Sequence, residues 1–265
     1  MARYLAIAAF ALSACPFACA IVIDLDFSGG SVNYSNPNQT LVIIYSDIAN
    51  GVGAPNLDLR LEALTTYIPN SAAAANNQNG SVSNSDDLKL HLDSGQSTRF
   101  RFSIFNGGTE TLYDPGVDYS YDFVMYDIDG NTSNPRGADS VTFYTPLTYT
   151  VTDTTSIDVM QSGNAITFTG TAGSVAGNEG LSSFANQDQE DASVSIVISN
   201  TSQFEFDFAT PQDVPADEGG RNLLIDPGSL AVDGDPVVFV PEMSFTSAIL
   251  GIFAAFVASR RRAIG

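Results

Sequence analysis

The sequence predicts an all-β fold, a single β-sandwich or jelly roll, on the basis of three observations. Apolar and polar residues alternate along many short segments, as they do in strands with one buried face. Clusters of Gly, Asn, Asp, Ser and Pro bound these segments, as turns require. No clear amphipathic helix lies between the two ends of the chain. With 265 residues, of which 44% are hydrophobic, the chain is long enough to bury a substantial core.

The alternation is clearest at residues 57–62, 88–93 and 204–208, where Leu or Phe fills every second position and most of the others are charged. This pattern is typical of antiparallel sheets with one face on a core and the other in water. We expect about ten to twelve strands. Further candidates are residues 21–27, 41–45, 99–105, 119–126, 141–144, 165–169 and 194–198.

Two polar segments interrupt the strand pattern. Residues 70–86 are rich in Asn, Ala and Ser, and residues 170–191 are rich in Gly, Asn and Gln. This polar composition predicts that both are long exposed loops. Neither segment has the length or compositional bias of a linker between domains. Residues 21–232 are therefore expected to form one acidic domain, followed by a polar spacer at residues 233–240.

The charge of the chain limits its partners. It carries 30 acidic and 10 basic residues, and residues 21–240 hold 29 of the acidic but only 6 of the basic ones, a net charge of −23. Proteins bind nucleic acids mainly by neutralising phosphates with Lys and Arg, so no nucleic-acid partner is expected. Cations remain compatible with this surface, and so do neutral extracellular polysaccharides.

The residues that most enzymes need are scarce. Cys15 and Cys19 both fall in the expected leader, so a chain that begins at Ile21 has no cysteine for a disulfide, a thiolate site or a nucleophile. His91 is the only histidine and lies on the polar side of its expected strand, which indicates a surface residue. The sequence therefore predicts a protein that is not an enzyme.

The N-terminus has the pattern of a secretion signal. An apolar helix is expected at residues 4–14, and Ala18 and Ala20 provide the small residues that signal peptidase requires. Cleavage after Ala20 is the first expectation. Residues 12–15 also match a lipoprotein signal, in which Cys15 would be lipidated, and this alternative stays open.

The C-terminus has a second, more specific pattern. Pro241, Glu242 and Met243 precede an apolar helix at residues 245–258. A short transmembrane helix would place the following basic residues on the cytoplasmic side of a bilayer by the positive-inside rule. These cytoplasmic anchor residues are Arg260, Arg261 and Arg262.

This order of residues resembles the PEP-CTERM sorting signal of Gram-negative bacteria that make exopolysaccharide. The resemblance implies an exosortase-type partner, passage through the inner membrane, and delivery to the cell surface or extracellular matrix. Met243 departs from the family pattern, which usually has a second proline there. The apolar run is also shorter than the roughly 20 residues of a simple spanning helix, and a packed C-terminal helix is the alternative.

Asp127 and Asp129 form the first candidate metal site. They follow an aromatic strand and precede Gly130, so their carboxylates could bind calcium. Calcium takes about six to eight oxygen ligands, so other loops would have to contribute. An ordinary Asp-Gly turn is the alternative. The nearest candidates for additional ligands are Asp24, Asp26 and Asp122.

Two other acidic turns have weaker functional interpretations. Residues 233–235, Asp-Gly-Asp, could bind a cation but are expected to be a solvated part of the spacer. Residues 93–95, Asp-Ser-Gly, match the aspartic-protease tripeptide, which functions in pairs, so a single copy indicates an ordinary turn.

Three functions remain in order of preference. The first is an exported, noncatalytic protein of the cell surface or exopolysaccharide matrix with a structural or adhesive role. The second is a calcium-assisted carbohydrate-binding module, in which tyrosines stack on sugars unless they are core residues. The third is a glycan hydrolase with paired carboxylates. The tyrosines concerned are Tyr113, Tyr119, Tyr144 and Tyr149.

Overall fold

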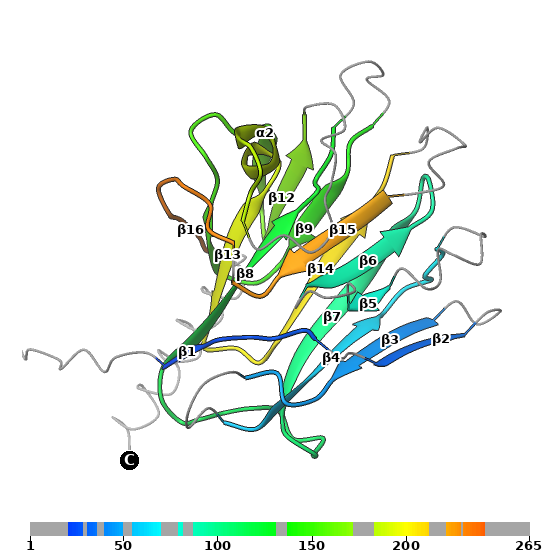
Figure 1. Ribbon diagram of the computed structural model, residues 1–265, viewed down its shortest axis with the longest axis vertical. Helices are drawn as coiled ribbons and strands as arrows, with labels where there is room; N and C mark the ends of the chain where they lie inside the picture. The colour runs from blue at the N-terminus through cyan, green and yellow to red at the C-terminus, as the bar shows by residue number, and fades with distance from the viewer. Residues whose placement is uncertain are drawn as a thin grey trace, which may run out of the picture.

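Two β-sheets pack face to face in the computed structural model, which confirms the all-β sandwich (Figure 1). Each sheet has eight strands, and the only helix in the described part of the chain is one short turn. The structure describes residues 21–28, 31–35, 40–49, 55–69, 79–81, 87–130, 137–171, 183–211, 221–228 and 230–241.

The first sheet is antiparallel except at one strand. β1 (Ile21–Ile23) runs parallel to the beginning of β8, and β15 pairs antiparallel with the end of β8. The other strands, in spatial order, are β16 (Val237–Phe239), β10 (Leu147–Thr150), β13 (Val194–Ser199), β8 (Tyr119–Tyr126), β15 (Arg221–Asp226), β6 (Leu88–Leu92) and β5 (Gly80–Ser81).

The second sheet is antiparallel throughout. Its longest strand, β7, has ten residues and lies between β4 and β14. In spatial order the strands are β11 (Ile157–Ser162), β12 (Ala165–Gly170), β9 (Ser140–Phe143), β14 (Gln203–Ala209), β7 (Ser97–Asn106), β4 (Leu57–Ala63), β3 (Thr40–Tyr45) and β2 (Ser31–Ser35).

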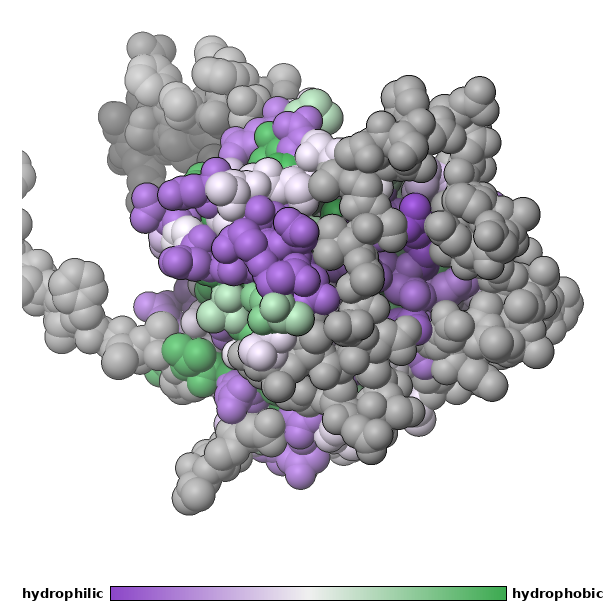
Figure 2. All heavy atoms as spheres, turned by 45° about the horizontal axis from the view of Figure 1, so that its top comes forward, coloured by the Kyte–Doolittle hydropathy of each residue, from purple (hydrophilic) through white to green (hydrophobic). Residues whose placement is uncertain are grey.

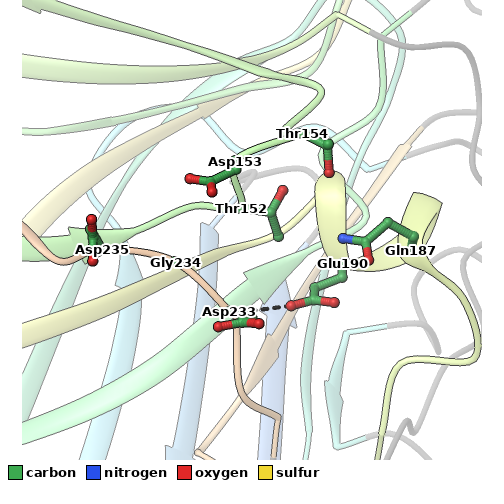
Figure 3. A pocket seen from close by; sticks show the side chains of 8 residues that line it. All are labelled: Thr152, Asp153, Thr154, Gln187, Glu190, Asp233, Gly234 and Asp235. Atoms are coloured by element: carbon green, nitrogen blue, oxygen red, sulfur yellow. Dashed lines mark hydrogen bonds between the residues drawn. The ribbon is translucent and has the colours of Figure 1, made fainter.

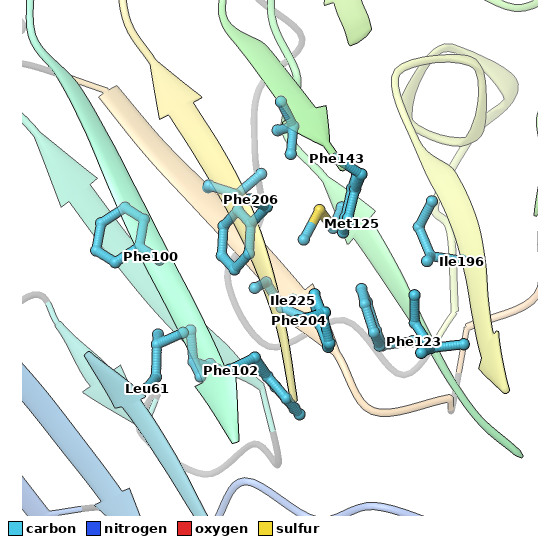
Figure 4. Close-up of a cluster of buried hydrophobic side chains, with 14 of the residues drawn as sticks. Leu61, Phe100, Phe102, Phe123, Met125, Phe143, Ile196, Phe204, Phe206 and Ile225 are labelled. Carbon is cyan, nitrogen blue, oxygen red and sulfur yellow. The ribbon is translucent and has the colours of Figure 1, made fainter. Parts of the chain in front are cut away.

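Aromatic rings fill the space between the two sheets (Figure 4). Phe204 of β14 stacks on Phe102 of β7 with ring centroids 4.8 Å apart. It also stacks on Phe123 of β8, across the sandwich, at 5.9 Å and an interplanar angle of 8°. Phe100, Phe143 and Phe206 extend this stack along the second sheet. These contacts join the inward faces of both sheets into one core.

The outer face of the first sheet is covered at β6, contrary to the simple alternation expected for residues 88–93. All five residues of β6 are buried, including Lys89 at 5% and His91 at 4% exposure. The prediction of a surface histidine is therefore wrong. Burial, and then the charge of Lys89, lower the pKa of His91 to about 4, although Asp93 opposes this. A small apolar cluster covers part of the same face, made of Val124, Tyr126, Leu224 and Leu230.

The outer face of the second sheet carries ion pairs between neighbouring strands. Arg99 Nε lies 2.7 Å from Asp207 Oδ1, and Arg101 lies 2.8 Å from Glu205. The Arg99 guanidinium also stacks over the Tyr144 ring at 4.6 Å. Partly exposed pairs of this kind contribute little stability each, about 1 kcal/mol or less. Their arrangement nevertheless neutralises this face locally.

Several elements differ from the expected loops. Helix α2 (Gln187–Asp191) and strand β16 fall in the expected loop 170–191 and in the expected spacer 233–240, respectively. Phe239 is buried and pairs with Leu147 of β10, so this part of the spacer joins the sheet. The described residues contain sixteen strands, more than the expected ten to twelve. The additional strands were not predicted because short strands such as β10 and β15 lack a long alternating pattern.

In the described part of the chain, no helix is long and apolar enough to cross a membrane. The expected leader at residues 1–20 and the expected apolar helix at residues 245–258 lie outside the described residues.

Replacing Phe204 should destabilise the sandwich strongly. Phe204→Ala removes a ring that contacts both sheets, so the free energy of unfolding should fall by about 3–5 kcal/mol in urea denaturation. Met160→Ala is the control, because Met160 is 59% exposed and its loss should cost less than about 0.5 kcal/mol. Equal losses in the two variants would contradict the central role of this stack.

Candidate functional site

A carboxylate-lined pocket, here called the acidic hollow, lies where β10 ends and β13 begins (Figure 3). Its volume is about 370 Å³. Three segments that are far apart in the sequence form it: the turn after β10, helix α2, and the turn before β16. The lining residues are Thr152, Asp153, Thr154, Gln187, Glu190, Asp233, Gly234 and Asp235.

Hydrogen bonds hold helix α2 between the two turns. The side chain of Asn186 caps the helix by accepting a hydrogen bond from the backbone N–H of Gln189 at 3.0 Å. On the other side, the backbone N–H of Asp233 donates to Glu190 Oε1 at 2.7 Å, as the dashed line in Figure 3 shows. The segment before β16 is therefore attached to the helix and is not a free spacer.

Asp191 attaches the helix to the turn after β10. Its Oδ1 accepts hydrogen bonds from the Thr152 hydroxyl at 2.5 Å, the Thr154 hydroxyl at 2.9 Å and the Gln187 amide at 2.9 Å. Burial alone would raise the pKa of Asp191, but these three donors lower it below its usual value. The carboxylate thus stays ionised and fixes the wall of the acidic hollow.

The acidic hollow has the electrostatics of a cation-attracting surface. Asp153, Glu190, Asp233 and Asp235 line it, and none of its described lining residues is basic. Such a site attracts cations and repels anions. The described residues nevertheless include no group of three or more acidic, histidine or cysteine side chains placed to hold a metal ion. The hollow is therefore a region of negative potential without a preformed metal cage.

The structure places Asp127 and Asp129 just beyond β8. Asp127 is half-buried and has a left-handed backbone with φ of 66°. Asp129 is buried, and its Oδ2 accepts a hydrogen bond from Arg221 Nη1 at 3.1 Å. Asp129 thus has a cationic partner within the chain, and calcium binding by this pair stays a prediction. The suggested helper Asp122 lies instead near Asp24, whose charge adds to burial in raising the pKa of Asp122.

Asp139 is a buried carboxyl that the sequence analysis did not identify. It is 1% exposed, and its side-chain oxygens accept no hydrogen bond from the described residues. Its backbone N–H donates to the Asp129 carbonyl at 2.8 Å. Burial raises the pKa of Asp139 well above its usual value; Arg221 opposes this shift, and the charges of Asp129 and Asp127 add to it. The carboxyl therefore favours its neutral form.

A second concavity, here called the open groove, lies at the other end of the sandwich, where β8 begins and β13 ends. Its volume is about 630 Å³. It combines apolar, amide, hydroxyl and carboxylate groups. The lining residues are Leu112, Tyr113, Asp114, Gly116, Val117, Asp118, Tyr119, Asn200, Thr201, Ser202 and Gln203.

The weaker candidates turn out to have structural roles. Residues 93–95 form a turn in which Asp93 Oδ1 accepts the backbone N–H of Ser94 at 2.8 Å. Tyr113, Tyr119 and Tyr149 are buried in the core, which favours their interpretation as packing residues. Tyr144 is half-buried on the outer face of the second sheet, beneath Arg99.

The processing residues fall at the ends of the chain. Pro241, which directly follows Val240 after β16, is described and half-buried. The signal-cleavage residues and the remainder of the sorting tail lie outside the described residues, and their roles stay predictions. These are Ala18, Ala20, Glu242, Met243, Arg260, Arg261 and Arg262.

Sequence reasoning missed the residues that organise the end of the sandwich where β8 ends and β13 begins. Asp191 belongs to a segment interpreted as a loop, although Asn186 three residues before Gln189 is a possible helix cap. Asp139 immediately precedes the β9 strand, and nothing in its immediate sequence distinguishes it from a turn residue. Arg221 follows a polar stretch, and its pairing with Asp129 depends on contacts far apart in the chain.

No protein-family model and no curated protein matches the sequence. Among solved structures, similarity is found to the N-terminal domain of the Streptococcus gordonii adhesin Sgo0707, with 11% identity, a TM-score of 0.42, and coverage of 74% of this chain and 47% of that one. Similarity is also found to the adhesin domain of PrgB from Enterococcus faecalis, with 13% identity, a TM-score of 0.42, and coverage of 76% of this chain and 67% of that one.

The same PrgB domain bound to DNA gives 13% identity and a TM-score of 0.39, covering 80% of this chain and 70% of that one. The chain thus spans about half the length of the Sgo0707 domain and about two thirds of the length of the PrgB adhesin domain. At this level of similarity the chain is assigned to no family. The expectation that it binds no nucleic acid stays a prediction.

Asp139→Asn should make stability less dependent on pH. Because the pKa of Asp139 is raised in the folded protein, its stabilising effect is present below the ordinary Asp pKa and is lost as the pH rises through the folded-state pKa. The free energy of unfolding of the parent should thus decline over this range more than that of the variant, which cannot ionise there. Urea denaturation of both proteins from pH 4, which is about the ordinary pKa of Asp, to pH 9 measures this difference. Parallel curves of unfolding free energy against pH would contradict the prediction.

Proposed function

We propose that this chain is the outer part of an exported, noncatalytic protein of the cell surface or exopolysaccharide matrix, with a structural or adhesive role. The observation that supports it most is the separation of charge. Arg60, Arg99 and Arg101 are paired on the outer face of the second sheet, whereas the acidic hollow has carboxylates without a basic residue in its described lining.

The unpaired negative charge keeps the surface hydrated. In Figure 2, which brings the end with α2 forward, hydrophilic residues cover most of the coloured surface. Self-repulsion of this charge opposes collapse and aggregation of copies, and a polyanionic surface attracts cations and basic partners. Both properties suit a protein that remains among hydrated polysaccharide chains.

The positions of the acids also favour a noncatalytic role. Asp139, a buried carboxyl with a raised pKa, is 1% exposed and therefore out of reach of a polymeric substrate. Asp153, Asp233 and Asp235 of the acidic hollow are exposed to solvent. A glycan hydrolase instead needs two convergent carboxyls in a substrate cleft, one of which is kept protonated by its surroundings.

The proposed route to the surface rests on the two ends of the sequence. An N-terminal signal would start export, and the PEP-CTERM-like tail would hold the chain in the inner membrane until an exosortase-type enzyme acts near Pro241. Because β16 ends at Phe239, the described fold ends two residues before this point. The enzyme would then work close to the folded sandwich.

The proposal predicts where the native protein is found and what its termini are. Intact mass measured on membrane and matrix fractions of the host should give a chain that begins at Ile21 and ends near Pro241 in the matrix. Deletion of the gene should reduce retention of cells on exopolysaccharide-coated surfaces. A chain that keeps Arg262 in the membrane fraction, or an intracellular chain, would contradict the proposal.

Two further measurements separate the other candidates. Retention that is lost with a chelator and restored by calcium would favour the calcium-assisted carbohydrate-binding module. Release of new reducing ends from the polysaccharide by the purified protein would favour the glycan hydrolase. The proposed function expects neither result.

The charge also predicts that the purified protein does not bind DNA. With 29 acidic against 6 basic residues between positions 21 and 240, phosphate contacts should be repulsive. Fluorescence anisotropy with a labelled duplex and a labelled single strand, at an ionic strength of about 0.15 M, should show no change up to high protein concentration. Saturable binding that weakens with added salt would contradict this expectation.

A further inference from the structure

Two connections that are distant in the sequence form the walls of the open groove. One is the segment from Leu112 to Tyr119 between β7 and β8, and the other is the turn from Asn200 to Gln203 between β13 and β14. Both leave from strands of the aromatic core, so the packing of the sheets fixes their positions. Sites built on rigid elements hold their geometry without a ligand.

Hydrogen bonds lock these two connections together. Asn200 has a left-handed backbone, with φ of 54°, which is costly for a residue other than glycine. Its side-chain Oδ1 accepts from the backbone N–H of Tyr119 at 3.0 Å, and its Nδ2 donates to Asp118 Oδ1 at 3.3 Å. The Tyr119 hydroxyl donates to Ser202 Oγ at 3.3 Å, and the Ser202 hydroxyl donates to the Tyr113 carbonyl. The polar floor is therefore preorganised.

A tight turn presents an apolar edge beside this floor. Asp114 Oδ1 accepts the backbone N–H of Gly116 at 2.8 Å, and Gly116 has φ of 68°, which only glycine adopts readily. The turn leaves Val117 52% exposed, and Leu112 is 40% exposed on the same connection. Two partly exposed apolar side chains thus lie in a concavity whose other groups are polar.

This combination defines the chemistry of a ligand. Exposed apolar side chains suit the C–H faces of a sugar ring, while the Gln203 amide and the Asp114 and Asp118 carboxylates can pair with its hydroxyl groups. The carboxylates disfavour an anionic ligand, since no basic residue is present in the described lining. We propose that the open groove binds a segment of a neutral, hexose-based oligosaccharide; this names the ligand class of the proposed function and rests on it.

The position of the groove suits a ligand close to the cell. Ile21 pairs with Tyr119 at the groove, and β16 runs back to the same end, where Phe239 pairs with Leu147. The described chain thus begins and ends at the end of the sandwich that carries the groove. Before the proposed processing of the tail, the groove would therefore face the cell and the acidic hollow would face away from it.

Isothermal titration calorimetry on the purified chain from Ile21 to Pro241 tests this proposal. The neutral probes are hexamers of β-1,4-glucose, β-1,3-glucose, α-1,4-glucose and β-1,4-mannose, each with and without EDTA. A glucosamine hexamer and a galacturonate hexamer serve as the cationic and anionic probes. At least one neutral hexamer should bind saturably, independently of EDTA, and the galacturonate hexamer should not bind.

Matched valine variants locate the binding. Val117→Ala removes apolar contact inside the groove and should weaken binding of the neutral hexamer about three- to tenfold. Val238→Ala makes the same chemical change on the β16 edge, where Val238 is 67% exposed, and should leave affinity within about twofold. Asp118→Asn keeps an oxygen for Asn200 and should change the affinity for a neutral sugar by less than about threefold. Melting temperatures of all three variants should match that of the parent.

Three results would overturn the proposal: no neutral hexamer binds, Val117→Ala and Val238→Ala weaken binding equally, or only the glucosamine hexamer binds and Asp118→Asn abolishes it. Failure of the groove can be told apart from failure of the proposed function. The cell fraction, the termini and the retention of cells are measured on the native protein and do not depend on which ligand occupies the groove. Saturable neutral binding by a protein found inside the cell would support the groove and refute the location.

Discussion

The stacking of Phe204 on rings from both sheets is the contact on which the rest of the structure depends. β14 lies in the middle of the second sheet, and Phe204 packs on its neighbour Phe102 and, across the sandwich, on Phe123. This fixes the alignment of β14 with β8, which pairs with β13, and the acidic hollow and the open groove lie at the two ends of β13. The sites therefore occur where connections leave a rigid core, which is where binding groups are usually placed.

The two sheets use their outer faces differently, and this divides the charge of the molecule. In the first sheet, β6, residues 123–126 of β8 and residues 223–226 of β15 are buried on both sides, so even Lys89 and Asp226 lie away from water. In the second sheet, arginines and carboxylates alternate between neighbouring strands and neutralise one another. Most of the remaining acidic side chains that are free to attract partners are thus found at the ends of the strands and on loops.

The sequence predicted the long strands well and the short ones poorly. β8 has the expected bounds, 119–126, because its apolar pattern and its flanking turns agree. β16 was missed, because three residues after an Asp-Gly-Asp-Pro turn carry too little pattern to separate a strand from a spacer. His91 was misplaced, because alternation marks which side chains share a face but not whether other segments cover that face. The walls of both concavities combine segments that are far apart in the sequence, which local patterns do not relate.

The few basic residues also decide how the folded chain meets proteases. Trypsin-like enzymes cut after Lys or Arg and act mainly on exposed loop tips and open termini. In the described part of the chain, every such residue lies inside a strand that is paired on at least one side. In this part of the chain, a trypsin-like protease therefore reaches these bonds only after the sheets open. The residues are Arg60, Lys89, Arg99, Arg101 and Arg221.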